Sequence, residues 1–186
     1  TMFELDSAIF LWINASASSA AWVLTLARFA SETLPQWLVA ACAGALLAAG
    51  PRVRIAVVRV LLAMVLAWLC ARGIKALLPM PRPFMLGLGT AWLPHAGSAG
   101  FPSSHASVAF AFAVAVAMQT PRRIGAWAAL AMATLIAWSR ISLGLHFPFD
   151  VAAGAVLGTV CGWAVVRLVM PRADPSLQPT PAAPHP

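Results

Sequence analysis

Charged side chains are scarce in this chain, at 9% of its 186 residues, against roughly 25% in an ordinary soluble domain. Hydrophobic residues account for 61% of the sequence, and the mean hydropathy is +0.85. This composition excludes an ordinary soluble domain and indicates an integral membrane protein. At about 20 residues per spanning helix, the length predicts a polytopic all-α bundle of five or six spanning helices.

Cysteine is also rare, with three residues in the whole chain. Cys42, Cys70 and Cys161 all lie in apolar stretches, and no CxxC or Cys/His spacing accompanies them. A structural metal site and a disulfide framework are therefore not indicated. We interpret the three cysteines as small buried hydrophobic side chains.

Acidic residues are fewer than basic ones, five against twelve, which leaves a formal net charge of +7. This excess does not indicate nucleic-acid binding, because the arginines are spread among apolar segments rather than gathered on one basic face. Six of them instead fall in or next to turns between apolar segments: Arg52, Arg54, Arg122, Arg123, Arg167 and Arg172. By the positive-inside rule, these turns are expected on the cytoplasmic side of the membrane.

The apolar segments divide the chain into expected helices. Residues 3–14 predict a short amphipathic helix, and residues 20–50 predict a helical region that spans the membrane once or twice. Further helices are expected at about 55–78, 102–118, 124–138 and 151–170, with a loop rich in proline and glycine at 79–101. The membrane domain is expected to comprise residues 2–172, and residues 173–186, rich in proline and alanine, to form a disordered tail.

One polar stretch interrupts the apolar sequence between the last two expected helices, where Arg140, His146 and Asp150 follow one another closely. Pro148 suits the first position of a helix, where its missing N–H costs nothing. His146 would then lie just outside the helix and Asp150 in its first turn, from which a carboxylate can reach the imidazole and fix its tautomer. With Arg140 able to bind an anion beside the ring, this layout is typical of a nucleophilic or general-base histidine acting on a phosphate.

Two other polar segments are expected on the same side of the membrane as this stretch. Lys75, the only lysine, precedes Arg82 by seven positions, and Ser103 and His105 begin the next expected helix after Pro102. If each helix between the arginine turns spans once, all three polar segments emerge on the face opposite those turns. That face is the outer one if the arginine turns are cytoplasmic.

In order and in internal spacing, the three segments together resemble the signature of the type 2 phosphatidic acid phosphatase (PAP2) superfamily, a group of acid-phosphatase-like lipid phosphatases. The resemblance covers residues 75–150 and departs from the common family pattern at Ser104, where glycine is usual. The wider sequence is similar to the bacterial undecaprenyl-pyrophosphate phosphatase branch at Ile13-Asn14-Ala15, Arg82-Pro83-Phe84, His95-Ala96, Phe101-Pro102-Ser103 and Ala137-Trp138-Ser139-Arg140. The resemblance implies a membrane helix bundle with a PAP2 core.

The resemblance also implies a role for each matched residue. His146 would be the nucleophile that forms a phosphohistidine, Asp150 would hold its other ring nitrogen, and His105 would protonate the leaving group and then activate water. Phosphoryl transfer requires positive charge and hydrogen-bond donors around the phosphoryl oxygens, and the expected phosphate-binding residues are Lys75, Arg82, Ser103, Ser104 and Arg140. No metal or other cofactor is expected, because these fixed cations already neutralise the phosphate.

Three remaining polar residues receive more modest interpretations. Glu32 is expected either to contact the substrate or to pair with Arg28, which lies four residues earlier on the same helix face. His95 and His185 are interpreted as ordinary loop residues.

The implied function is dephosphorylation of undecaprenyl pyrophosphate to the monophosphate, which recycles the lipid carrier of cell-wall synthesis at the outer face of the bacterial inner membrane. The expected partners are this lipid substrate and the membrane lipids, with no nucleic acid. One alternative is a phosphatase or phosphotransferase acting on phosphatidate, phosphatidylglycerol phosphate or lipid A. The other is a non-catalytic transporter or binding protein for anionic lipids, which would use the cations but has no need of two histidines and an orienting aspartate.

Overall fold

The computed structural model describes residues 1–169, and the tail expected at 173–186 lies outside the described residues. Residues 1–169 contain helices and no strands, so the all-α prediction is confirmed. The helices are α1 (Met2–Ile13), α2 (Ala21–Arg28), α3 (Leu34–Ala48), α4 (Pro51–Leu77), α5 (Ser104–Ala117), α6 (Arg123–Ser142) and α7 (Pro148–Ala164). Three short elements accompany them: the π-helical turns η1 (Phe29–Thr33) and η3 (Val165–Val169), and the 3₁₀ turn η2 (Pro83–Leu86).

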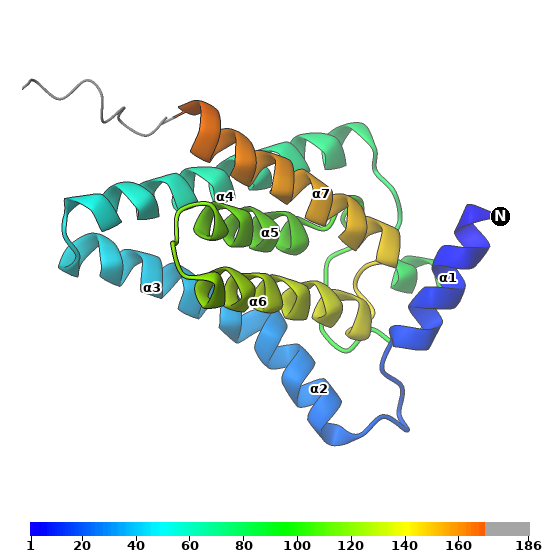
Figure 1. Ribbon diagram of the computed structural model, residues 1–186. Helices are drawn as coiled ribbons and strands as arrows, with labels where there is room; N and C mark the ends of the chain where they lie inside the picture. The colour runs from blue at the N-terminus through cyan, green and yellow to red at the C-terminus, as the bar shows by residue number, and fades with distance from the viewer. Residues whose placement is uncertain (170–186) are drawn as a thin grey trace, which may run out of the picture.

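Helix α5 is the centre of the bundle, with α4, α6 and α7 packed around it (Figure 1). Its buried side chains are all small: Ala106, Ser107, Ala109, Ala111, Ala113 and Ala115. Helix α7 faces it with a glycine at every fourth position, Gly154, Gly158 and Gly162. A Cβ added at Gly158 would lie 2.1 Å from the carbonyl oxygen of Ser107. The backbones of α5 and α7 therefore touch, in the packing mode that small residues give to membrane helices.

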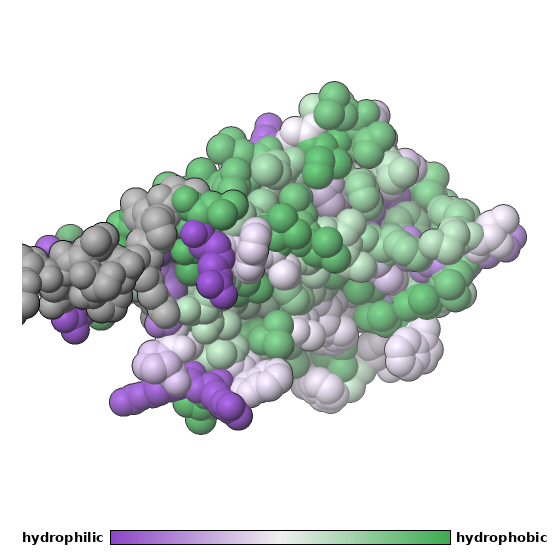
Figure 2. Space-filling model, turned by 45° about the horizontal axis from the view of Figure 1, so that its top comes forward, coloured by the Kyte–Doolittle hydropathy of each residue, from purple (hydrophilic) through white to green (hydrophobic). Residues whose placement is uncertain are grey.

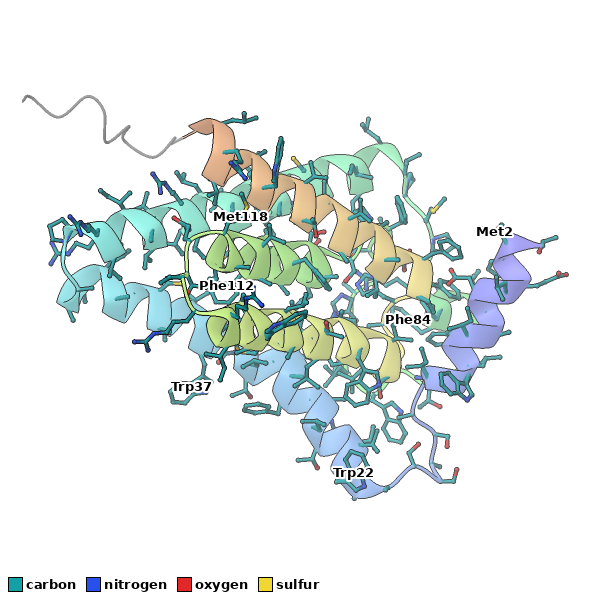
Figure 3. The ribbon with its side chains drawn as sticks, in the orientation of Figure 1. Met2, Trp22, Trp37, Phe84, Phe112 and Met118 are labelled. Carbon is teal, nitrogen blue, oxygen red and sulfur yellow. The ribbon has the colours of Figure 1, made fainter. Side chains whose placement is uncertain are left out.

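In the part of the chain that the structure describes, three helices are long and apolar enough to cross a membrane, namely α4, α6 and α7 with its continuation to Leu168. Helix α5 is apolar but shorter. The visible face of the molecule is mostly hydrophobic or intermediate in character (Figure 2). Trp22 and Trp37 are 66% and 67% exposed and point away from the bundle (Figure 3). Such a surface suits contact with lipid.

Residues 21–48, for which one or two crossings were expected, form a single helical run through α2, η1 and α3. The π-helical turn η1 lies in its middle, and the backbone remains right-handed helical at both ends of this turn. Pro35 follows directly in the first turn of α3, and proline and π-helical turns are both recognised causes of bends in a continuing helix. This region therefore contains one long helix rather than two.

The long helices alternate in direction, which brings the three polar segments to one end of the bundle (Figure 1). Helices α4 and α6 end there, α5 and α7 begin there, and α1 contacts α6 and α7 at the same end. The helix expected to end near residue 138 continues to Ser142, so Arg140 lies in the last turn of α6 rather than in a loop.

Candidate active site

A tight turn between α6 and α7 places His146 beside Arg140. Gly144 lies two residues beyond the end of α6 and has a φ of +75°, the left-handed conformation in which many helices end at glycine. The N–H groups of Leu145 and His146 then both donate to the carbonyl oxygen of Arg140, at 3.0 and 3.2 Å. A Cβ at Gly144 would lie 2.1 Å from the carbonyl oxygen of Thr90, so the turn requires glycine on steric grounds as well.

The ring of His146 lies between a carboxylate and a guanidinium. Pro148 is the first residue of α7, as predicted, and Asp150 lies in the first turn. The Oδ2 atom of Asp150 accepts from the N–H of Phe147 at 3.0 Å and lies 3.3 Å from Nδ1 of His146. On the other side of the ring, Nη1 of Arg82 donates to Nε2 of His146 at 3.0 Å. Because an arginine cannot accept a hydrogen bond, we infer that the proton is on Nδ1 and that Nε2 carries the lone pair.

His146 is 2% exposed, and this burial is the main reason why the pKa of its ring lies well below 6.5. The positive charges of Arg82, Arg140 and Lys75 lower the pKa of His146 further. The ring is therefore neutral at pH 7, which is the form that a nucleophile requires.

Lys75 and Arg82 both hold the loop segment 98–100 by its carbonyl oxygens. The Nζ atom of Lys75 donates to the carbonyls of residues 99 and 100, both at 2.9 Å. Arg82 is 3% exposed and donates to the carbonyls of residues 98 and 99 at 2.8 and 3.3 Å, and to that of Leu145 at 2.9 Å. Both cations are thereby fixed at the end of α5 where Ser103 and His105 begin the helix.

Arg140 is equally buried, at 3% exposure, and Nη1 of its guanidinium donates to Oγ of Ser31. The π-helical turn η1 carries Ser31, and such turns are frequent at functional sites. The Nε atom of Arg140 has no hydrogen-bond partner within residues 1–169. Arg140 therefore keeps a buried donor for an anion.

Glu32 follows Ser31 in η1 and is close enough for its charge to act on Arg140. The alternative pairing of Glu32 with Arg28 does not occur among the described residues, since Arg28 donates instead to the carbonyl oxygen of Trp92 at 3.4 Å. Glu32 is exposed and does not line the cavity described below.

Ser103 is the N-cap of α5, and its Oγ accepts from the N–H of Ala106. Its own N–H donates to the carbonyl oxygen of Asp150 at 2.9 Å, which ties the first turn of α5 to that of α7. The Ser103 side chain is fully buried and does not line the cavity, so its place is that of a helix cap rather than of a side-chain phosphate ligand. The first-turn N–H groups of Ser104 and His105 lie at a helix N-terminus, a position that favours anions.

These polar residues share one cavity of about 400 Å³. Six of the eight residues expected to act in catalysis or phosphate binding line it: Lys75, Arg82, Ser104, His105, Arg140 and His146. Asp150 lies behind His146, with which it shares a hydrogen bond, and Ser103 lies behind the first turn of α5. Within residues 1–169, His, Cys, Asp and Glu form no group of three or more that could hold a metal ion.

His95, interpreted from the sequence as an ordinary loop residue, also lines this cavity. Burial, followed by the charges of Arg82, Arg140 and Lys75, lowers the pKa of His95 to about 4. Its ring is therefore neutral at pH 7 and can exchange hydrogen bonds with a phosphate without adding a charge.

An apolar groove of about 300 Å³ lies next to the cavity, and Trp68, Ser104 and His105 line both. From these residues the groove continues along the hydrophobic side chains of α3, α4, α5 and α6: Leu38, Val39, Met64, Val108, Phe112 and Ile136 (Figure 3 labels Phe112). A polar cavity and an apolar groove that meet at His105 match the two parts of a phosphorylated lipid.

Residues 56–174, which hold all three polar segments, match the PAP2 superfamily. The chain belongs to this superfamily.

Named relatives agree with this assignment. The chain is 32% identical over 161 residues to a protein of Escherichia coli K12 that bears the name "Putative undecaprenyl-diphosphatase YbjG", covering 84% of this chain and 79% of that protein. It is 36% identical over 87 residues to the undecaprenyl-diphosphatase BcrC of Bacillus subtilis 168, covering 47% and 44% of the two chains. The crystal structure of LpxE from Aquifex aeolicus has a TM-score of 0.68 at 24% identity and covers 85% and 92%, a likeness of fold. The family and fold predicted from the three segments are confirmed, and the chain is a membrane phosphatase of the PAP2 type.

Two residues that the sequence did not single out support the PAP2 site from the end of the bundle near α1. Asp6 is 8% exposed, and its Oδ1 accepts from the N–H of Phe149 at 3.0 Å. This N–H belongs to the first turn of α7 and has no partner within the helix. Asn14 donates to the carbonyls of Thr90 and Ser142, both at 3.0 Å, and accepts from the N–H of Thr90 at 2.7 Å. The only sequence signal was for Asn14, in the Ile13-Asn14-Ala15 motif that is similar to the undecaprenyl-pyrophosphate phosphatase branch. Nothing in the sequence pointed to Asp6.

Replacing Asp6 by alanine is expected to lower the free energy of unfolding by about 1 kcal/mol, the usual loss when a helix cap is removed. Turnover should fall with it, because the first turn of α7 also carries Asp150. Asp6→Asn keeps an acceptor and should recover most of both. Thermal unfolding in detergent and phosphate release measure the two effects, with Leu11→Ala as the control on the exposed face of α1. An unchanged unfolding temperature in Asp6→Ala would contradict the capping role.

Proposed function

We propose that this PAP2 protein hydrolyses undecaprenyl pyrophosphate to undecaprenyl phosphate and inorganic phosphate. The observation that carries the proposal is that the cationic cavity around His146 and an adjacent apolar groove share Trp68, Ser104 and His105 as lining residues. A diphosphate would occupy the cavity while the first part of a polyprenyl chain follows the groove. The similarity to YbjG and BcrC, both named as undecaprenyl-diphosphatases, favours this lipid over other phospholipids.

The first chemical step is attack by Nε2 of His146 on the terminal phosphorus. The hydrogen bond from Arg82 to Nε2 is exchanged for one to a phosphoryl oxygen, which frees the lone pair. A P–N bond forms and the P–O bond of the anhydride breaks. His105, which must enter this step as an imidazolium beside the anionic diphosphate, gives its proton to the leaving lipid phosphate and becomes neutral. The imidazole gains positive charge, which Asp150 stabilises through Nδ1.

In the second step, a water molecule gives a proton to His105 and its oxygen attacks the phosphohistidine. The P–N bond breaks, inorganic phosphate is released, and His146 returns to its neutral form. In both steps the charge on the phosphoryl oxygens is stabilised by Lys75, Arg82 and the unpaired Nε of Arg140. Together the two steps consume one water and leave the enzyme unchanged.

The active end of the bundle is proposed to face the periplasm from the inner membrane. The turns with Arg52, Arg54, Arg122 and Arg123 lie at the opposite end of α4, α5 and α6, which the positive-inside rule assigns to the cytoplasm. The enzyme would then recycle the lipid carrier of cell-wall synthesis on the side where the pyrophosphate is released.

A substrate panel with the purified protein tests the proposal. The panel contains undecaprenyl pyrophosphate, phosphatidate, phosphatidylglycerol phosphate and lipid A. Undecaprenyl pyrophosphate should give the highest kcat/KM of the four, with inorganic phosphate as product. A higher kcat/KM for another lipid would overturn the substrate assignment. Phosphate that appears only on an added acceptor lipid would make the protein a phosphotransferase, and binding of every lipid without turnover would make it a carrier.

A further inference from the structure

Arg72 is a further cation that lines the cavity, and it lies outside the three signature segments. It lies on α4 one turn before Lys75, is exposed, and lines the same cavity. Its guanidinium carbon lies 5.2 Å from the ring centroid of Trp68. Within residues 1–169 this cation–π contact is the only interaction of its side chain besides the charge it exerts on Lys75. The N–H donors of Arg72 are therefore available to an anion, while the Trp68 ring limits where the guanidinium can move.

The residues that line the cavity and the groove indicate which part of a lipid substrate Arg72 would meet. His146 and Arg82 line the polar cavity alone, whereas Trp68 and His105 line both the cavity and the apolar groove. A lipid whose chain lies in the groove and whose terminal phosphate lies at His146 must pass His105 and Trp68 in between. Its leaving group is therefore on the side where Trp68 holds Arg72.

The leaving group differs in charge between substrate classes. The leaving group of a polyprenyl diphosphate is a lipid monophosphate, which carries negative charge. The leaving group of phosphatidate is an uncharged alcohol. A guanidinium beside the leaving group can form charge-assisted hydrogen bonds with the first and has no anion to bind in the second.

We propose that Arg72, held on Trp68, is a second phosphate subsite that gives the enzyme its preference for diphosphate over monophosphate lipids. The inference rests on the proposed function, since it identifies the group that recognises the second phosphate. The cations around His146 can bind the terminal phosphate of either a phosphate monoester or a diphosphate. Arg72 would bind only the second phosphate, which the diphosphate has and the monoester lacks.

The test is Arg72→Gln, compared with Arg72→Lys and with Arg52→Gln, an exposed arginine at the opposite end of the same helix. Arg72→Gln should lower kcat/KM for undecaprenyl pyrophosphate about tenfold, the usual loss of one charge-assisted hydrogen bond. Phosphatidate turnover should change by less than about twofold. Arg72→Lys should recover part of the loss, because it restores the charge without the planar donors, and Arg52→Gln should match the wild type.

Inhibition by small anions provides a second readout that requires no particular lipid. The inhibition constant of inorganic pyrophosphate should rise about tenfold in Arg72→Gln, while that of orthophosphate stays the same. Equal changes for both anions, or none, would overturn the subsite whichever lipid the wild-type panel favours. If the panel favours a monophosphate lipid while the pyrophosphate constant still rises, the proposed substrate fails and the subsite stands as an anion site only.

Discussion

Alanine at His146 is expected to abolish phosphate release, by about 10⁴-fold or more, while lipid binding survives. The variant removes the atom that attacks phosphorus and leaves the surrounding cations in place. Arg82 loses one partner, Nε2, and keeps its hydrogen bonds to the carbonyls of residues 98, 99 and 145. The cavity should therefore still bind a phosphorylated head group.

Trapping of the intermediate measures this prediction directly. Wild-type protein quenched during turnover of radiolabelled substrate should retain an acid-labile phosphate label, and His146→Ala should retain none. Arg52→Gln is the control, because it changes an exposed residue at the opposite end of α4 from the cavity. Turnover at the wild-type rate in His146→Ala, or label lost in both variants alike, would refute the nucleophile assignment.

The second large effect is expected at Gly158, far from the chemistry. Even a methyl group there would lie 2.1 Å from the carbonyl oxygen of Ser107 and 2.9 Å from the nitrogen of Ala111. Both atoms belong to the backbone of α5, so they cannot yield without moving the helix. Gly158→Ala should therefore destabilise the protein by about 3 kcal/mol, at the upper end for overpacking. Most activity should go with it, since α5 carries His105 and α7 carries Asp150.

Gly44→Ala is the matched control for Gly158→Ala. Gly44 lies in α3 and a Cβ there would meet nothing within 4 Å. Removing a glycine from a helix interior should stabilise the protein by up to about 1 kcal/mol. Thermal unfolding in detergent and phosphate release compare the two variants. An unfolding temperature for Gly158→Ala equal to that of Gly44→Ala would rule out the close approach of α5 and α7.

The parts of the site that the sequence predicted are those encoded by local signals. Pro148 predicted where α7 begins, and with it the position of Asp150 relative to His146. Ser103 after a proline predicted the start of α5. In both cases one or two residues determine the backbone at that point, so no knowledge of the rest of the fold was needed.

The parts that the sequence did not predict depend on contacts between distant segments. Helix α6 was expected to end before Arg140, because a charged residue there was read as part of a loop. It continues to Ser142, and the buried guanidinium of Arg140 donates to Ser31, which lies 109 residues earlier in the chain. Asp6 caps α7 across 143 residues, and no local pattern indicates which helix a buried carboxylate will meet.

Both Lys75 and Arg82 donate to carbonyl oxygens of the segment 98–100. A phosphate that enters the cavity can accept from the third N–H of Lys75, but it must share or take over donors of Arg82 that already have acceptors. Binding of the head group is then largely an exchange of carbonyl oxygens for phosphate oxygens around the donors. Its net free energy is therefore less favourable than the charges of Lys75, Arg82 and Arg140 alone would suggest. When inorganic phosphate leaves, the same exchange would run in reverse and return these donors to the backbone carbonyls.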